Sequence, residues 1–372
     1  MRRTPIATVA LLTFTYLVLA AVPAAADELI ATVARPTTIS ALDGRIVWSD
    51  YDPAVKRYFL TQRLNGVTSR LPVGARSVPF DLDLGPDADG KPVAAYSRCR
   101  RDPPPRNRPR GAIAQLPEWR LGRGCDLYLY SFEQGREVLV RFASSRAASE
   151  FLPTVWTDRI AFARVFERRR GRAGRRAFLY SRPNSLFTSQ GRRGHTRRLP
   201  GGPRTGPGPT ALDLATRRLA FGWDSTDPRP LSSVYLDVMR NTGRTAKRRL
   251  DRGHSGELQG REFIAPQFDE QVRVVWLASF EGDKTEAHLR RYSFMGEQRE
   301  EARIPPLPAD FIWRTSIAGA VDGDDYLYLA SGFVDTGGGP CNTPASCIAH
   351  PGCSDLEPCE LRRALAPAFR PR

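Results

Sequence analysis

One short pattern recurs six times along this chain of 372 residues and constrains its fold more than any other feature. Each copy is a continuous apolar run that carries an aromatic residue, and the first is RIVWSD at 45–50. The others are VAAYSR at 93–98, RIAFAR at 159–164, RLAFGW at 218–223, RVVWLA at 273–278 and DYLYLA at 325–330. Short β-branched and aromatic runs bounded by turns are typical of buried strands. The chain is therefore expected to repeat one β-rich unit.

The spacing of the copies predicts a propeller. The central aromatic residues follow one another at intervals of 48, 66, 59, 55 and 52 residues, and they are Trp48, Tyr96, Phe162, Phe221, Trp276 and Tyr328. A four-stranded propeller blade needs about 40–50 residues plus loops. Turn signals such as Asp43-Gly44 and Asn65-Gly66 separate the predicted strands. We predict an all-β, six-bladed β-propeller of four-stranded antiparallel blades over residues 27–335.

The polarity of the strands supports this architecture. A blade packed between two neighbours buries both of its faces, so its inner strands should be apolar without alternation, as the repeated runs are. The segments RYFLTQR at 57–63 and TAKRRL at 245–250 carry charge, as outer edges should. A β-sandwich also contains short, regularly spaced strands and is the alternative. The recurrence of one unit favours the propeller.

The two ends of the chain suggest how the ring closes. The sixth unit shows only two clear strands, and the segment ELIATVA at 28–34 could supply its missing edge. Strand patterning stops near residue 335, and residues 336–372 form a cysteine-rich tail. We expect the tail cysteines to hold this part of the blade in place of regular strand pairing.

Residues 1–26 have the form of a signal peptide. Arg2 and Arg3 precede an apolar run over 7–22, and three alanines at 24–26 offer a small-residue cleavage site. An uncleaved membrane anchor is the alternative. No later stretch approaches the roughly 18 apolar residues that a membrane span needs. We expect a secreted protein without an integral membrane segment after cleavage.

Six cysteines in an exported chain indicate disulfides. Cys99 and Cys125 end two facing strands, so we predict that they are joined and clip the insertion between them. The remaining cysteines, Cys341, Cys347, Cys353 and Cys359, recur every six residues. A four-cysteine zinc site is the alternative, but zinc sites usually show tighter pairs.

The order of features within each unit resembles the TolB-type, WD40-like propeller repeat. In that family an aspartate turn precedes an I-A-F-like strand, and a Y-L-Y-like strand follows. The corresponding turn aspartates here are Asp43, Asp158, Asp213, Asp269 and Asp322, with Asp83 or Asp87 in the second unit. The family's Ser-Pro before the turn is missing throughout. The resemblance spans most of 36–331 and implies a rigid ring that presents loops for binding other proteins.

No motif for catalysis, cofactor or metal binding stands out. The four histidines lack metal-ligand spacing, and Gly253–Gly256 lacks the final glycine of a nucleophile elbow. The carboxylates Asp81, Asp83, Asp87 and Asp89 could hold calcium in principle, but they lack the spacing of an EF-hand, as do Asp322, Asp324 and Asp325. We interpret these aspartates as turn residues.

The strongest candidate binding feature is basic. The formal net charge is +16, of which Arg2 and Arg3 supply two. Two arginine-rich insertions leave the same strand of adjacent units, and their candidate ligand-binding residues are Arg100, Arg101, Arg168, Arg169 and Arg170. Guanidinium groups suit carboxylates and phosphates, but the aromatic residues that stack on nucleic acid bases are missing.

We therefore expect a monomeric, non-catalytic binding module without a cofactor, whose partner is a protein or an anionic polymer and not a nucleic acid. The alternative is a propeller hydrolase or lyase acting on extracellular polysaccharide or peptide. An enzyme should bring Asp, Glu or His side chains together in the central cavity, whereas a binding module should present a basic or aromatic rim.

Overall fold

The structure is a computed structural model. It describes residues 27–104, 117, 119–146, 148–166, 177–183, 197–199, 201–202, 208–225, 231–239, 245–254, 261–280, 286–292, 299–303, 312–333, 359–365 and 367–371. The predicted signal peptide lies outside these residues. Within the described ranges, no helix has both the length and the apolar character needed to cross a membrane.

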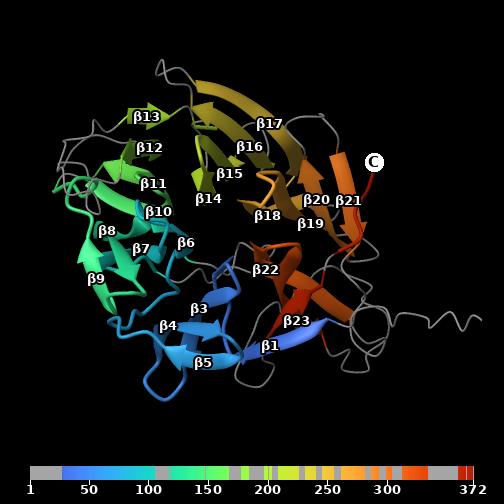
Figure 1. Cartoon of the computed structure of the whole chain (residues 1–372), viewed down its shortest axis with the longest axis horizontal. Coiled ribbons are helices and arrows are strands. Elements are labelled where there is room, and N and C mark those ends of the chain that lie inside the picture. The colour runs from blue at the N-terminus through green and yellow to red at the C-terminus, as the bar shows by residue number, and fades with distance from the viewer. Residues whose placement is uncertain are drawn as a thin grey trace, which may run out of the picture.

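The described strands form six antiparallel sheets arranged as blades around a central axis (Figure 1). Blade 1 contains β2 (Ile39–Leu42), β3 (Arg45–Asp52), β4 (Arg57–Leu64) and β5 (Val67–Arg70), and blade 2 contains β6 (Asp83–Pro86), β7 (Pro92–Arg101), β8 (Arg123–Ser131) and β9 (Arg136–Leu139). Blade 3 contains β10 (Ala148–Trp156), β11 (Arg159–Phe166), β12 (Ala177–Pro183) and β13 (Arg197–Leu199), and blade 4 contains β14 (Gly208–Ala215), β15 (Arg218–Ser225), β16 (Leu231–Met239) and β17 (Thr245–His254). Blade 5 contains β18 (Arg261–Phe268), β19 (Val274–Phe280), β20 (Glu286–Tyr292), β21 (Arg299–Arg303) and β25 (Arg370–Pro371). The predicted six-bladed propeller is confirmed.

The repeated apolar runs form the second strand of every blade, where both faces are covered. Their six central aromatic side chains are at most 2% exposed: Trp48, Tyr96, Phe162, Phe221, Trp276 and Tyr328. Burying one such side chain contributes roughly 1.5–3 kcal/mol. The aromatic residue therefore recurs because each blade needs one large apolar side chain between itself and its neighbour.

Blade 6 joins the two ends of the chain. It contains β22 (Ile312–Asp322), β23 (Asp325–Phe333), β24 (Cys359–Ala364) and, at its outer edge, β1 (Glu28–Val33). β1 pairs antiparallel with β24, and Figure 1 shows the blue N-terminal strand beside the red C-terminal ones. The predicted closure by the N-terminal strand is confirmed.

The expectation for the C-terminal tail needs correction. It contributes a regular strand, β24, which pairs with β23 on one side and β1 on the other. Sequence patterning missed it because the segment CELRRA is short and charged. Cys359 is buried and disulfide-bonded at the start of this strand, whereas Cys341, Cys347 and Cys353 lie outside the described residues.

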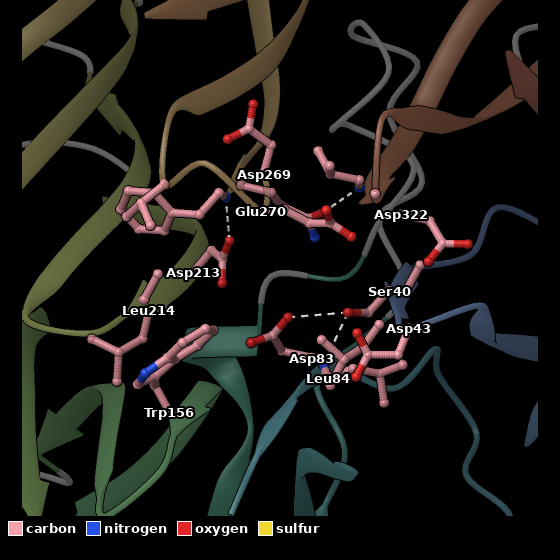
Figure 2. A pocket seen from close by; sticks show the side chains of 18 residues that line it. Ser40, Asp43, Asp83, Leu84, Trp156, Asp213, Leu214, Asp269, Glu270 and Asp322 are labelled. Carbon is pink, nitrogen blue, oxygen red and sulfur yellow. Dashed lines mark hydrogen bonds between the residues drawn. The ribbon is translucent and has the colours of Figure 1, made fainter. Parts of the chain in front are cut away.

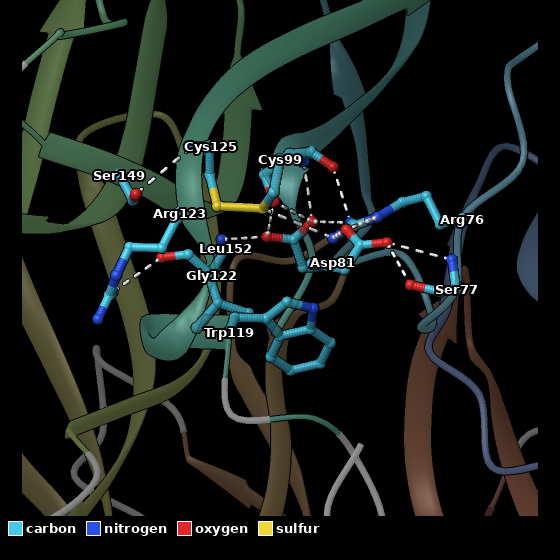
Figure 3. Close-up of a disulfide and its surroundings, with 12 residues drawn as sticks. Arg76, Ser77, Asp81, Cys99, Trp119, Gly122, Arg123, Cys125, Ser149 and Leu152 are labelled. Atoms are coloured by element: carbon cyan, nitrogen blue, oxygen red, sulfur yellow. Dashed lines mark hydrogen bonds and ion pairs between the residues drawn. A yellow bond between two sulfur atoms is a disulfide. The ribbon is translucent and has the colours of Figure 1, made fainter. Parts of the chain in front are cut away.

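The predicted disulfide between Cys99 and Cys125 is present (Figure 3). The two residues face each other on β7 and β8, with a Cα–Cα distance of 3.8 Å. The bond lies at the base of the insertion, whose short 3-10 helix η2 (Trp119–Leu121) packs against β10. The indole Nε1 of Trp119 donates a hydrogen bond to the Pro79 carbonyl, 3.4 Å away. The disulfide and this hydrogen bond thus anchor the insertion to the rest of the propeller.

A chain that begins at Ile39 instead of Asp27 lacks β1 and should be much less stable. β1 buries Ile30 and Val33, and without it β24 becomes an unpaired edge. We expect aggregation, or a midpoint of thermal unfolding clearly below that of the chain from Asp27. A chain lacking residues 370–372 loses only β25 and should unfold close to the parent. Equal midpoints for all three would show that β1 does not close the ring.

Replacing both Cys99 and Cys125 with Ser should lower the free energy of unfolding by about 3 kcal/mol. Without the cross-link, the unfolded chain regains the conformational entropy that closing a loop of about 25 residues removes. Urea unfolding under non-reducing conditions measures this loss. The control replaces Arg101 and Arg123 with Ser, since they face each other on the same two strands without a covalent link. A loss no greater than in the control would contradict the prediction.

Candidate functional site

A cavity of about 290 Å³ opens at one mouth of the central channel (Figure 2). The first strand of each blade is the innermost, and each of these six strands contacts the next one around the ring. The cavity is lined by residues of all six of these strands, with Trp156 alone from β10, together with the turns after β2, β18 and β22. Every blade therefore contributes at least one residue to the wall of the cavity.

One position recurs in all six innermost strands. It pairs with the residue directly before the buried central aromatic, and its occupants are Ser40, Asp83, Thr154, Asp213, Gln267 and Ala320. Five of the six are polar, although the neighbouring positions are largely apolar. We call this set the inner polar ring.

Members of the inner polar ring join one blade to the next. The Leu84 amide donates to Ser40 Oγ at 2.9 Å, and the Leu214 amide donates to Thr154 Oγ1 at 2.9 Å. In the same way the Phe268 amide donates to Asp213 Oδ2 at 2.5 Å, and the Val321 amide donates to Gln267 Oε1 at 2.8 Å. At the closing junction Ala320 has no acceptor, and the Gly44 amide donates instead to Asp322 Oδ1 at 2.9 Å.

Asp83 departs from this pattern. Its side chain is only 5% exposed. Its Oδ1 accepts a hydrogen bond from Ser40 Oγ at 3.1 Å. Its Oδ2 meets no donor with hydrogen-bond geometry among the described residues, although the Thr154 hydroxyl lies near enough to lower the pKa of the group. Figure 2 shows this free oxygen pointing away from Ser40, towards the part of the cavity that holds Trp156 and Asp213. A buried, unsatisfied polar atom is uncommon and calls for an explanation.

Two carboxyl groups of the ring have raised pKa values. Burial raises the pKa of Asp83 well above its usual range, and the nearby charge of Asp213 raises it further. Burial also raises the pKa of Asp213 to about 7, against the lowering effect of the Phe268 amide. Because the two groups interact, they titrate as a coupled pair, and burial favours the protonated form of each.

The rest of the cavity wall is acidic as well. Asp269 pairs with Arg273 at 2.6 Å, and Asp322 pairs with Arg363 at 3.1 Å. Asp43 and Glu270 are exposed at the rim. None of the 18 lining residues is Lys, Arg, His or Cys. The mouth thus carries an excess of negative charge.

The structure brings together residues that the sequence had assigned only to turns. Asp43, Asp213, Asp269 and Asp322, with Asp83, line one cavity, whereas Asp87 and Asp158 do not line it. The signal in the sequence was their equivalent place in successive units, but spacing alone could not show that these side chains converge. Within the described part of the chain, no group of three or more His, Cys, Asp or Glu residues is arranged to hold a metal ion.

The other aspartates singled out in the sequence lie elsewhere. Asp81 is buried near the disulfide, accepts hydrogen bonds from the Ser97 and Leu152 amides at 2.8 and 2.7 Å, and lies 3.6 Å from Arg76 (Figure 3). Asp87 accepts hydrogen bonds from the amides of its own turn. These contacts give both residues a structural role.

The predicted basic site lies apart from the acidic mouth. Arg100 and Arg101 are exposed at the end of β7, and the start of this strand is the end nearer the cavity. Arg168, Arg169 and Arg170 lie outside the described residues. The pairing of the two insertions into one anion-binding rim therefore stays a prediction.

Replacing Asp83 with Asn should stabilise the protein increasingly as pH rises. A raised pKa means that the folded state holds its proton more tightly, so this contribution to stability is full below about pH 4 and is lost as pH rises through the folded pKa. Asn cannot ionise. We expect the free energy of unfolding of the variant to exceed that of the parent by at least about 1 kcal/mol at pH 8 and to match it near pH 4.

Urea unfolding at pH 4, 6 and 8 measures this difference. The control is Asp89→Asn, in an exposed turn, which should show no growth with pH. A variant that is no more stable than the parent at pH 8 would contradict the raised pKa of Asp83.

No protein-family model matches the sequence, and no curated protein is similar to it. Among solved structures, similar ones include a puromycin hydrolase at 13% identity and a TM-score of 0.48, covering 82% of this chain and 51% of that one. TolB from Acinetobacter baumannii is similar at 12% identity and a TM-score of 0.43, covering 88% of this chain and 65% of that one.

A third similar structure is the six-bladed Aleuria aurantia lectin, at 11% identity and a TM-score of 0.45, covering 84% of this chain and 99% of the lectin. This chain thus spans about half the length of the puromycin hydrolase and about two thirds of TolB. These similarities are distant. Its function has to be argued from its own cavity.

Proposed function

We propose that this chain is an exported, non-catalytic β-propeller binding module that receives a basic segment of a partner protein at the acidic mouth of its channel. The carrying observation is the composition of the cavity wall, where carboxylates from five blades meet and no basic side chain lines the space. Negative charge concentrated in a concave, partly buried site attracts cationic groups.

The charge of the whole chain is not an obstacle to this function. The net charge is strongly positive, yet the Debye length at physiological ionic strength is only about 8 Å. A basic segment within that distance of the mouth responds to the local carboxylates more than to arginines on remote strands. The site and the overall charge can therefore favour opposite partners.

The use of the inner polar ring supports binding over catalysis. Ser40 both donates to Asp83 and accepts from the Leu84 amide, so its hydroxyl is committed. Asp213 and Gln267 are each held by a backbone amide of the next blade. Side chains that hold the blades together are poorly placed to move during a reaction.

One observation favours the alternative of a hydrolase or lyase. Glycoside hydrolases use a protonated carboxyl group together with an ionised one, and the Asp83–Asp213 pair offers both states near neutral pH. Incubation with extracellular polysaccharides and peptides, followed by detection of new chain ends, tests this reading. Cleavage that disappears in Asp83→Asn would replace the binding proposal with an enzymatic one.

Binding to a capped dodecapeptide that contains four lysines tests the proposed function. We expect saturable binding that weakens with added salt, and no binding of the matched peptide with glutamates. Replacing Asp43 with Asn and Glu270 with Gln removes two charges from the rim and should weaken binding at least about twofold, because exposed ion pairs contribute roughly 0.2–1 kcal/mol each. Fluorescence anisotropy of the labelled peptide gives the affinities.

The control replaces Arg100 and Arg101 with Ser, at the far end of β7. Binding of the lysine peptide should be unchanged or slightly tighter in this variant. Failure of the lysine peptide to bind, or equal binding of the glutamate peptide, would refute the proposed function.

A further inference from the structure

We propose that Asp83, Asp213 and Trp156 form the recognition site for a single ammonium or guanidinium group, and that this group displaces one proton from the two carboxyls into solvent. The inference rests on the proposed function, because the same mouth would admit the basic segment that carries the group. The group recognised there is an organic cation, and its binding should depend on pH.

The first observation is the free oxygen of Asp83. The carboxyl is nearly fully buried, and Ser40 holds its Oδ1. Its Oδ2 points into the cavity and, although the Thr154 hydroxyl lies nearby, meets no donor with hydrogen-bond geometry among the described residues. Leaving such an acceptor unpaired costs the desolvation free energy of that oxygen. A cationic donor that reached this oxygen would remove that cost and form a charge-assisted hydrogen bond.

The second observation is the orientation of Asp213. The Phe268 amide holds its Oδ2 at 2.5 Å, which fixes the plane of the carboxyl. In Figure 2 its other oxygen points down towards Trp156. Asp83 Oδ2 and the second oxygen of Asp213, whose carboxyl also interacts with the Leu214 amide, thus face a common part of the cavity from blades 2 and 4.

The third observation is the aromatic wall between these blades. Trp156 ends β10 of blade 3, is partly exposed, and lines the same cavity as Leu214. An indole face attracts ammonium and guanidinium groups, most strongly where water is excluded. Two carboxyls and an indole together select an organic cation over a hydrated metal ion, which would need more oxygen ligands.

Charge balance explains the displacement of a proton. Near pH 6 Asp213, whose pKa is raised to about 7, is mostly protonated, and burial raises the pKa of Asp83 as well. When a cation of charge +1 enters, one proton leaves to solvent, one of the two carboxyls becomes ionised, and the total charge in the site stays the same. The exchange therefore avoids burying a net charge, which is the costly step for ion pairs in proteins.

Other charged groups face the pair from the remaining innermost strands and their turns. Asp269 and Asp322 are already neutralised by Arg273 and Arg363, at 2.6 and 3.1 Å. Asp43 and Glu270 are exposed, so water and salt screen their charges. Asp43 and Glu270 therefore serve to raise the local concentration of cations near the pair.

Isothermal titration calorimetry with the lysine dodecapeptide tests the proposal on the chain from Asp27. Titrations at pH 6 in two buffers of different ionisation enthalpy give the number of protons released. We expect about one proton per peptide, and an affinity that rises about tenfold per pH unit between pH 5 and 6.5. The matched peptide with four arginines shows whether a guanidinium serves as well as an ammonium.

Two double variants remove the same formal charge from different places. Asp83→Asn with Asp213→Asn should abolish proton release, flatten the pH dependence and weaken binding at least tenfold. Asp43→Asn with Glu270→Gln should weaken binding more modestly and keep the release of one proton. Trp156→Leu keeps both carboxyls and should retain proton release with several-fold weaker binding, which serves as a second test if the first variant does not fold.

The outcomes separate this inference from the proposed function. Binding of the lysine peptide without proton release, or with equal affinity in both double variants, overturns the inference while the binding function stands. A lysine peptide that does not bind to the parent overturns both.

Discussion

The hydrogen bonds between neighbouring blades at the inner polar ring are the interaction on which the propeller depends. Among the described residues each blade is a separate hydrogen-bonded sheet, and the backbone contact between blades 2 and 3, at Asp87 and Thr157, is an isolated bridge. Apolar packing fills the space between blades, but such packing is not directional. The side chains of Ser40, Thr154, Asp213 and Gln267 each accept a backbone amide of the following blade and so fix the angle between the two.

This structural use of polar residues also explains the character of the cavity. A six-bladed ring leaves an opening at its axis, and the acceptors that connect the blades point towards it. In the inner polar ring, Asp83 has one carboxyl oxygen that accepts a hydrogen bond and one that does not. Asp213 supplies a second carboxyl, which is close enough to raise the pKa of the first. The candidate site is therefore a local departure from a structural repeat, and its chemistry follows from that departure.

Closure of the ring sets the second constraint. The last blade takes its outer strand, β1, from the start of the chain and its third strand, β24, from the C-terminal segment, so neither strand can be removed without exposing an edge. The short β25 then extends the C-terminus across to blade 5. Because the first and last segments meet in one blade, the innermost strands that line the cavity are held in a closed circle rather than an open arc.

The sequence by itself determined the repeat, the number of blades, the strand that each central aromatic occupies, the closing role of 28–34 and the link between Cys99 and Cys125. These follow from local patterns: apolar runs, turn residues and cysteines at the ends of facing strands. Only the tertiary structure decided that β24 is a strand and that aspartates about 50 residues apart converge on one cavity. The physical reason is that a side chain's burial, its unpaired atoms and its raised pKa depend on neighbours from other blades, which no local pattern records.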